Sequence, residues 1–121
     1  MQQDIFITLT GFDHYYGKLP LAIGNIVKLV KDSENCHDSE AIYAELPYVG
    51  KVAYVANSAN TAAGGTFSAG RLYDKFEKIC YAKIRFTSFT KVICEVFPDD
   101  YEIEQQMLRQ TQKEEDEDLS F

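Results

Sequence analysis

The sequence predicts a mainly β chain that folds into a small six-stranded β-barrel, with one or two short helices and an acidic C-terminal helix or tail. Its length of 121 residues suggests one domain of modest size. Six segments show the residue pattern that is typical of strands, and one helix stands between them, a common make-up for a small barrel. Hydrophobic residues make up 45% of the chain, and eight Tyr and eight Phe suit a β-rich core.

Four strands are predicted in the first half of the chain, at residues 4–10, 25–31, 41–45 and 51–56. Gly11 ends the first strand, and a Tyr-rich turn follows it. The connection at residues 20–24 is short and has room for one helical turn. The polar stretch 32–40 predicts a loop, and residues 47–50 predict the turn between the third and fourth strands.

The second half predicts one helix and a β-hairpin. Residues 57–65 are small and polar, which indicates irregular structure. Ser68 is a suitable N-cap for a helix that extends to Glu77, in which Leu72 and Phe76 are spaced i, i+4. Strands at residues 80–87 and 91–97 then pair as a hairpin. On the first of them the alternation places Cys80, Ala82, Ile84 and Phe86 on one face, and Tyr81, Lys83, Arg85 and Thr87 on the other.

The negative charge of the chain is confined to its end. The net charge is −7, yet residues 1–98 hold ten acidic and ten basic side chains. We therefore expect a barrel domain at residues 1–98 and an acidic helical or disordered tail at residues 99–121. Asp99 and Glu102 resemble a capping box, which predicts a helix at about residues 100–113. Its main apolar positions are Ile103 and Met107, and a solvated, disordered run is expected at residues 114–118.

Several protein classes are not expected. Cys36, Cys80 and Cys94 are widely spaced without a Cys-x-x-Cys pair, which predicts a reduced, cytoplasmic protein with the last two thiols in the core. No signal peptide or membrane-spanning stretch is predicted. No arrangement of nucleophile, base and acid presents itself, so neither an enzyme nor a cofactor is expected. Cys36, His37 and Asp38 are adjacent and cannot readily converge on one metal ion.

Three segments occur in an informative order. They are Gly-Phe-Asp-His-Tyr-Tyr-Gly at residues 11–17, Asn-Cys-His-Asp-Ser-Glu-Ala-Ile at residues 35–42 and Gly-Lys-Val-Ala-Tyr-Val-Ala-Asn at residues 50–57. Over residues 5–97 their order and spacing resemble the HIRAN domain, in particular its small stand-alone bacterial members. The resemblance implies an OB-like barrel. It also implies binding of single-stranded DNA at a free 3′ end, in DNA repair or defence, because relatives fused to helicase-like remodellers have that activity.

The residues of the implied site suit the parts of a DNA end. Aromatic rings can stack on bases, and a carboxylate can accept the terminal hydroxyl while it repels a terminal phosphate. Backbone amides at a helix start and basic side chains can bind phosphates. The expected nucleic-acid-binding residues are Tyr15, Tyr16, Tyr54 and His37 for stacking, Asn35 and Asp38 for the hydroxyl, Ser68, Arg71 and Lys75 for phosphates, and Asn57 beside them.

Three positions depart from the DNA-binding relatives. Asp13 and His14 replace a basic residue and a Tyr in the first turn, and Asn57 stands where those relatives have a basic residue. Fewer positive charges predict weaker and more salt-sensitive binding of DNA, or a different ligand.

Each candidate residue also has a purely structural interpretation. Asn35 and Asp38 can stabilise their loop by bonding its backbone, and either Tyr15 or Tyr16 can belong to the core. Residues 64–66, Gly-Gly-Thr, lack the Gly-Lys-Ser/Thr ending of a phosphate loop and can be a simple turn.

Two further functions stay open. One is a protein-interaction adaptor, in which the acidic tail recruits a partner and the barrel presents a groove. The other combines both ideas, with the tail lying as an autoinhibitor across the basic side chains of Arg71, Lys75, Lys83 and Arg85.

Overall fold

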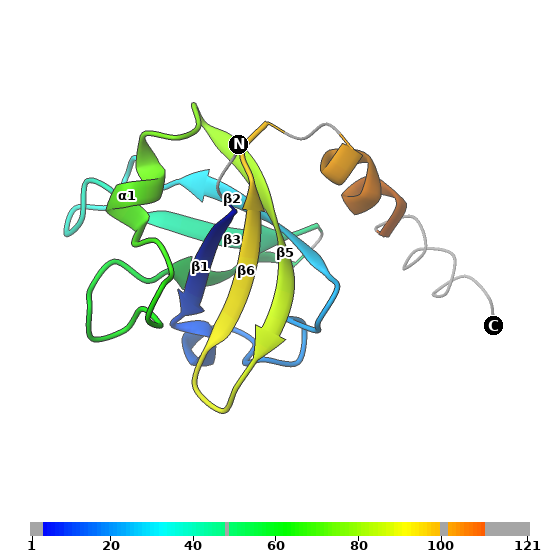
Figure 1. The fold of residues 1–121 in the computed structure, drawn as a ribbon, viewed down its shortest axis with the longest axis horizontal. Coiled ribbons are helices and arrows are strands. Elements are labelled where there is room, and N and C mark those ends of the chain that lie inside the picture. The colour runs from blue at the N-terminus through cyan, green and yellow to red at the C-terminus, as the bar shows by residue number, and fades with distance from the viewer. Residues whose placement is uncertain (1–3, 48, 100–101, 111–121) are drawn as a thin grey trace.

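The computed structural model describes residues 4–47, 49–99 and 102–110, and its strands form one closed barrel (Figure 1). The elements are β1 (Ile5–Thr10), the 3-10 helix η1 (Phe12–His14), β2 (Ile26–Lys31), β3 (Ile42–Leu46), β4 (Gly50–Val55), α1 (Ala69–Tyr73), β5 (Ile79–Thr87) and β6 (Val92–Phe97). Around the barrel the strand order is β1-β4-β3-β2-β5-β6, and every neighbouring pair is antiparallel. The mainly β, six-stranded barrel predicted from the sequence is confirmed.

The core fills the inside of the barrel with alternate residues of each strand, as the pleat of a β-strand requires. The completely buried residues include Ile7, Leu9, Val27 and Leu29. The side chains of Cys80 and Cys94 are at most 1% exposed. Burial raises the pKa of both thiols to about 12. The predicted burial of the two cysteines is confirmed, and Leu72 of α1 joins the same cluster.

The prediction that Phe86 faces the core is wrong. Cys80, Ala82 and Ile84 are buried, but the pairing of β5 with β6 shifts register between Ile84 and Phe86. A β-bulge of this kind opposes two residues to one and reverses the alternation beyond it. Phe86 is therefore opposite the outward-facing Ile93 and its side chain is 61% exposed.

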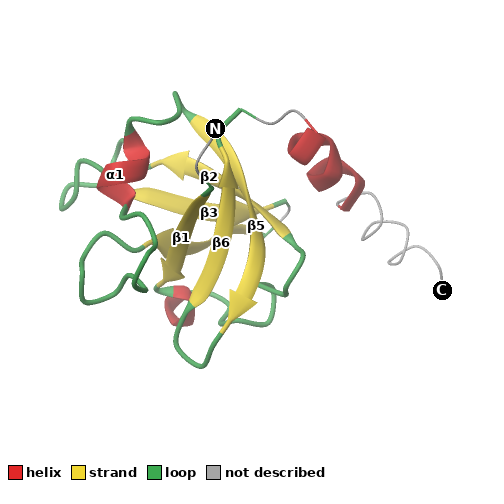
Figure 2. Ribbon diagram, in the orientation of Figure 1, coloured by secondary structure: helices red, strands yellow, loops and turns green. Residues whose placement is uncertain are grey.

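Helix α1 is shorter than predicted. Ser68 caps its N-terminus through a hydrogen bond from the Arg71 amide to the Ser68 hydroxyl, so the N-cap is confirmed. The helix ends at Tyr73 instead of Glu77. Phe76 is still buried, from a turn beyond the helix. The expected helical turn at residues 20–24 is absent, and the 3-10 helix η1 comes earlier, on a different side of the barrel from α1 (Figure 2).

Residues 102–110 are helical and pack on the outside of the barrel. Ile103 and Met107, the predicted apolar positions, are buried against Ile26 and the half-buried rings of Tyr81 and Phe97. The side chain of Gln110 accepts a hydrogen bond from the Ile26 amide, with an N to O distance of 3.1 Å. The expected disordered run at residues 114–118 lies outside the described residues, as does the expected helix beyond residue 110. Within the described residues no helix has the length and apolarity needed to span a membrane.

Candidate nucleic-acid interface

The Asn35–Asp38 loop connects β2 to β3, and its own side chains stabilise its conformation. The carboxamide oxygen of Asn35 accepts hydrogen bonds from the amides of His37 (2.9 Å) and Asp38 (3.0 Å). Asp38 Oδ1 accepts from the Glu40 amide at 2.9 Å. These are the local bonds by which Asn and Asp stabilise turns, so the structural interpretation of both residues is confirmed.

Hydrogen-bond capacity now separates the roles of Asn35 and Asp38. An amide oxygen has two lone pairs, and both of those on Asn35 accept backbone amides. Binding of the terminal hydroxyl by Asn35, which was expected both to donate and to accept, stays a prediction. Each carboxylate oxygen of Asp38 accepts one bond, Oδ1 from Glu40 and Oδ2 from Asn57 at 2.8 Å. Asp38 therefore keeps two acceptor positions, and its half-exposed side chain leaves them accessible.

Asn57 connects the loop to the start of α1. Its Nδ2 donates to Asp38, and its Oδ1 accepts from the Gly70 amide at 2.8 Å. Three more amides at the start of α1 also have partners: Ala69 donates to the Ala56 carbonyl, Arg71 to the Ser68 hydroxyl and Leu72 to the Ser68 carbonyl. All four of these donors are occupied, so the binding of phosphate by amides after Ser68 stays a prediction that requires one of these bonds to open.

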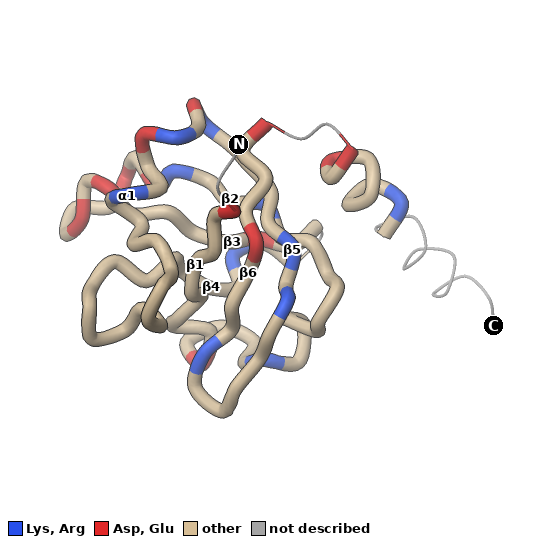
Figure 3. Tube along the Cα trace, in the orientation of Figure 1, with Lys and Arg blue, Asp and Glu red and all other residues tan. Residues whose placement is uncertain are grey.

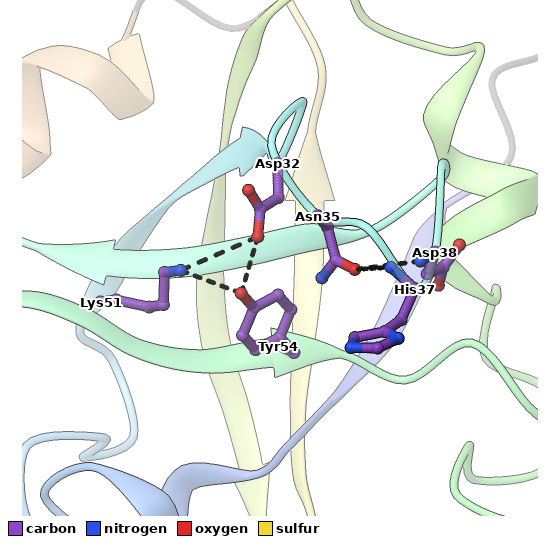
Figure 4. A network of polar contacts seen from close by, with 6 residues as sticks. All are labelled: Asp32, Asn35, His37, Asp38, Lys51 and Tyr54. Atoms are coloured by element: carbon purple, nitrogen blue, oxygen red, sulfur yellow. Dashed lines mark hydrogen bonds and ion pairs between the residues drawn. The ribbon is translucent and has the colours of Figure 1, made fainter.

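A second polar network lies beside the loop, on the outer face of β3 and β4 (Figure 4). The Tyr54 hydroxyl donates to Asp32 Oδ2 at 2.7 Å, and Lys51 Nζ donates to the same hydroxyl at 2.9 Å. Lys51 and Asp32 also form an ion pair at 3.8 Å. The Lys51 ammonium lies 4.6 Å from the centre of the Tyr43 ring and 5.1 Å from that of Tyr54. The two tyrosine rings pack edge to face, 6.3 Å apart.

This network shifts the protonation of its members. The hydrogen bond from Tyr54 lowers the pKa of Asp32, against the opposing effect of burial. The hydrogen bond to Tyr54 raises the pKa of Lys51. Burial is the largest cause that raises the pKa of Tyr54 and of Tyr43. The network therefore holds a carboxylate, an ammonium and a neutral phenol together at neutral pH.

The other aromatic candidates, His37, Tyr15 and Tyr16, differ in their exposure and in their position relative to this network. The His37 side chain is exposed, and in Figure 4 its ring lies on the same side of the loop as the Tyr54 ring. Tyr15 follows η1, which contacts β4, and is close enough to Lys51 to affect the pKa of that lysine. Tyr15 and Tyr16 are 38% and 59% exposed, so neither ring belongs to the core.

The cationic groups of Arg71 and Lys75 lie over an aromatic ring outside the Tyr54 network, that of Phe67. The Arg71 guanidinium is 4.0 Å from the centre of the Phe67 ring, and the Lys75 ammonium is 5.7 Å from it. Within the described residues neither cation has an ion-pair partner. The hydrogen bond from the Gly70 amide to Asn57 Oδ1 links their segment to the loop, but they do not join the Tyr54 network. Residues 64–66 form a turn. The Thr66 hydroxyl donates to the Ala63 carbonyl and is also hydrogen-bonded with the Thr8 hydroxyl, so these residues have a structural role.

Sequence reasoning missed Asp32, Lys51 and Tyr43. Their signal was the pairing of β3 with β4, in which Tyr43 is opposite Tyr54 and Glu45 is opposite Lys51. A hairpin with a short turn fixes such a register, but a register shift between Ala44 and Glu45 prevents its extrapolation from the turn alone.

Comparison with protein-family models, with curated proteins and with solved structures finds no match for this chain. Among the described residues no group of three or more His, Cys, Asp or Glu side chains is placed to hold a metal ion.

Proposed function

We propose that this chain is a non-catalytic module that binds the 3′ end of single-stranded DNA at the Asn35–Asp38 loop, as a HIRAN-like domain acting in bacterial DNA repair or defence. One observation carries the proposal. A loop that is braced by its own hydrogen bonds presents the exposed His37 ring and the half-exposed Asp38 carboxylate, and in Figure 4 the Tyr54 ring lies between this loop and Lys51.

The rings supply the stacking surface. Bases stack on aromatic side chains without regard to sequence, and each stacked base contributes about 1–3 kcal/mol. His37 is suited to this role because the Asn35 oxygen fixes its backbone while its side chain is free in solvent. Tyr15, which is close enough to Lys51 to affect its pKa, and Tyr16 offer further exposed rings.

Asp38 supplies the selectivity for the end. Its two unused acceptor positions suit a terminal hydroxyl, which must donate its hydrogen to an oxygen. A terminal phosphate in the same place would bring a second negative group against the Asp38 carboxylate. The carboxylate therefore favours a 3′-hydroxyl over a 3′-phosphate.

The phosphate contacts of the proposed site come from side chains. Because the amides of α1 are occupied, the available donors are the ammonium of Lys51, which is 35% exposed, and the cations of Arg71 and Lys75. Contacts of this kind release counterions on binding and weaken steeply with salt. The body of the chain is neutral overall, so the affinity depends on these few local charges.

Fluorescence anisotropy with a labelled oligonucleotide tests the proposal on the full chain. The strand that ends in a 3′-hydroxyl is expected to bind more tightly than the same strand with a 3′-phosphate, and binding should weaken as salt is added. Equal affinity for both ends contradicts the role of Asp38. Absence of binding at low salt, both in the full chain and in a variant whose acids at residues 114–118 are replaced by amides, contradicts DNA as the ligand.

Matched substitutions separate the roles of the loop residues. Asp38→Asn should reduce the preference for the hydroxyl end, whereas Glu34→Gln, which removes the same charge from an exposed side chain of the same loop, should not. His37→Ala should weaken binding by about 1–3 kcal/mol, whereas His37→Phe should retain it because the ring remains. Similar losses for His37→Phe and His37→Ala would mean that stacking is not the contribution of this residue.

A protein-interaction adaptor is the second candidate, and the docked helical segment 102–110 favours it. Ile103 and Met107 fix that segment on the barrel, so the acidic residues that follow begin from a defined place. A pull-down with and without the acids at residues 114–118 distinguishes the two functions. Partners that depend on the Asn35–Asp38 loop but not on those acids would argue against a tail-led adaptor.

A further inference from the structure

A cluster of exposed apolar side chains lies at one end of the barrel, away from the Asn35–Asp38 loop. Its members, which we call the barrel-end patch, are Leu19 (92% exposed), Ile23 (64%), Phe86 (61%) and Phe89 (90%). Two hydrogen bonds bring the two contributing segments together, from the Gly24 amide to the Ile84 carbonyl and from Lys18 Nζ to the Ser88 carbonyl, both 2.8 Å long. Lys18 also lies over the Phe89 ring at 5.5 Å.

The patch is built into the fold by the β-bulge in β5. The register shift between Ile84 and Phe86 turns Phe86 outward, opposite Ile93, in a strand that otherwise buries alternate residues. Single exposed apolar residues are common on protein surfaces, but four large apolar side chains on two segments that hydrogen bonds hold together suit binding of an apolar partner. A bulge that exposes a phenylalanine is a feature that folding alone does not require.

The two segments that contain the patch carry basic side chains. Residues 18–26 and 83–91 have four Lys or Arg side chains and no Asp or Glu. In Figure 3 the basic positions follow β5 and continue into the turn before β6. Arg85 is neutralised by Glu95 at 2.8 Å, whereas Lys18, Lys83 and Lys91 have no ion-pair partner within the described part of the chain. The patch therefore suits a segment that is both acidic and apolar.

Residues 111–121 have that composition, and the residue before them, Gln110, is held within reach of the patch. Five consecutive acids at residues 114–118 precede Leu119, Ser120 and Phe121. Gln110, the last described residue before them, is bonded to the Ile26 amide. Ile26 is three residues from Ile23, so their Cα atoms are at most about 11 Å apart, and the nine steps from Gln110 to Leu119 span up to about 30 Å.

We infer that residues 111–121 bind the barrel-end patch of the same chain, with Leu119 and Phe121 against its apolar side chains and the acids beside Lys18, Lys83 and Lys91. The apolar contacts give the segment a fixed place, and the ion pairs select it by charge. This placement differs from a tail that lies across Arg71 and Lys75, because Gln110 is held within reach of the patch. It is independent of the proposed DNA site.

Paramagnetic broadening in the full chain tests the inference. Ser120→Cys, in a Cys36→Ser background, provides one site for a nitroxide label, since Cys80 and Cys94 are buried. The amide resonances of Leu19, Ile23, Phe86 and Phe89 should lose most of their intensity relative to the chemically reduced sample. Those of residues 69–73 in α1 should not. Broadening at α1 in place of the patch, or uniform broadening over the barrel, would overturn the inference.

Two controls test whether Leu119 and Phe121 make the contacts and whether the segment binds its own chain or a second copy. Adding Leu119→Ser and Phe121→Ser to the labelled chain should restore the patch resonances, whereas Leu108→Ser, at an exposed apolar position outside the patch, should not. In a mixture, one chain carries the nitroxide but no ¹⁵N, and the other carries ¹⁵N but no nitroxide. The patch resonances of the ¹⁵N chain should then stay intact. Broadening in that mixture would mean that the segment binds a second copy, and would overturn the intrachain placement.

Discussion

Replacing Tyr54 by Phe removes one oxygen atom from the centre of the network on β3 and β4. The Asp32 carboxylate loses the donor at 2.7 Å, and the Lys51 ammonium loses the acceptor at 2.9 Å. What remains between the two charges is an ion pair at 3.8 Å, which is a weak contact at a surface. The ring stays in place, so the edge-to-face packing on Tyr43 is preserved.

The expected loss of stability is about 1–2 kcal/mol. Hydrogen bonds to charged groups contribute about 1.5–3 kcal/mol, and the lower part of that range applies because the Lys51 side chain is 35% exposed and water can replace part of the lost bond. For a chain of this size a loss of about 1.5 kcal/mol lowers the melting temperature by roughly 5–10 °C.

Urea unfolding followed by far-ultraviolet circular dichroism measures the difference, and Tyr43→Phe is the matched control. Tyr43 is opposite Tyr54 across the strand pair, and its hydroxyl has no hydrogen-bond partner within the described residues, so the same chemical change there should cost less than about 0.5 kcal/mol. Equal losses in the two variants would refute the assignment of stability to the network.

The stability that the Tyr54–Asp32 hydrogen bond contributes should depend on pH in a definite direction. The Tyr54 hydrogen bond lowers the folded pKa of Asp32 below its ordinary value of 3.8. The stabilisation is therefore complete above pH 3.8 and is lost as the pH falls through the folded pKa. The excess loss in Tyr54→Phe over Tyr43→Phe should shrink as the pH falls below 3.8. An excess that stays constant throughout the acid range would mean that the carboxylate is not the partner that matters.

Three further predictions concern other parts of the fold. Asn57→Ala should cost about 1 kcal/mol in urea unfolding because two hydrogen bonds disappear, and an unchanged midpoint would contradict its bridging role. Ile103→Ala should cost about 2 kcal/mol and speed amide exchange at Ile26, whereas exchange that does not change would mean that residues 102–110 do not protect the barrel. A thiol reagent at pH 8 should modify Cys36 in the native chain and reach Cys80 and Cys94 only on denaturation, since burial excludes the reagent and raises the pKa of both thiols to about 12.

The strands were predictable because burial imposes a period of two on the sequence. Each of the six strands begins and ends within one residue of its expected bounds. The end of α1 was not predictable from spacing alone, since Leu72 and Phe76 are both buried as an i, i+4 pair would be, but the chain leaves the helix between them. Phe86 was mispredicted for a related reason, because a bulge changes the side of the strand without changing its residue types.

The candidate site was predictable in its residues more than in their roles. Asn35, Asp38 and Asn57 do lie together, which their order in the sequence suggested. Which of them has free hydrogen-bonding capacity depends on partners such as Glu40 and Gly70, and these partners are set by the folded backbone. Lys51 and Asp32 were missed because they are far apart in the sequence and meet only when β3 pairs with both of its neighbours.

The side-chain amide of Asn57 ties two surface segments into one opening unit. Its two ends are not interchangeable, since the NH₂ group faces the Asp38 carboxylate and the oxygen faces the Gly70 amide. A fluctuation that lifts the Asn35–Asp38 loop from the barrel must therefore release the first turn of α1 or break this bridge. The Gly70 amide proton thus becomes a reporter of loop opening, with an exchange rate that ligand binding at the loop should slow even though the ligand does not contact that amide.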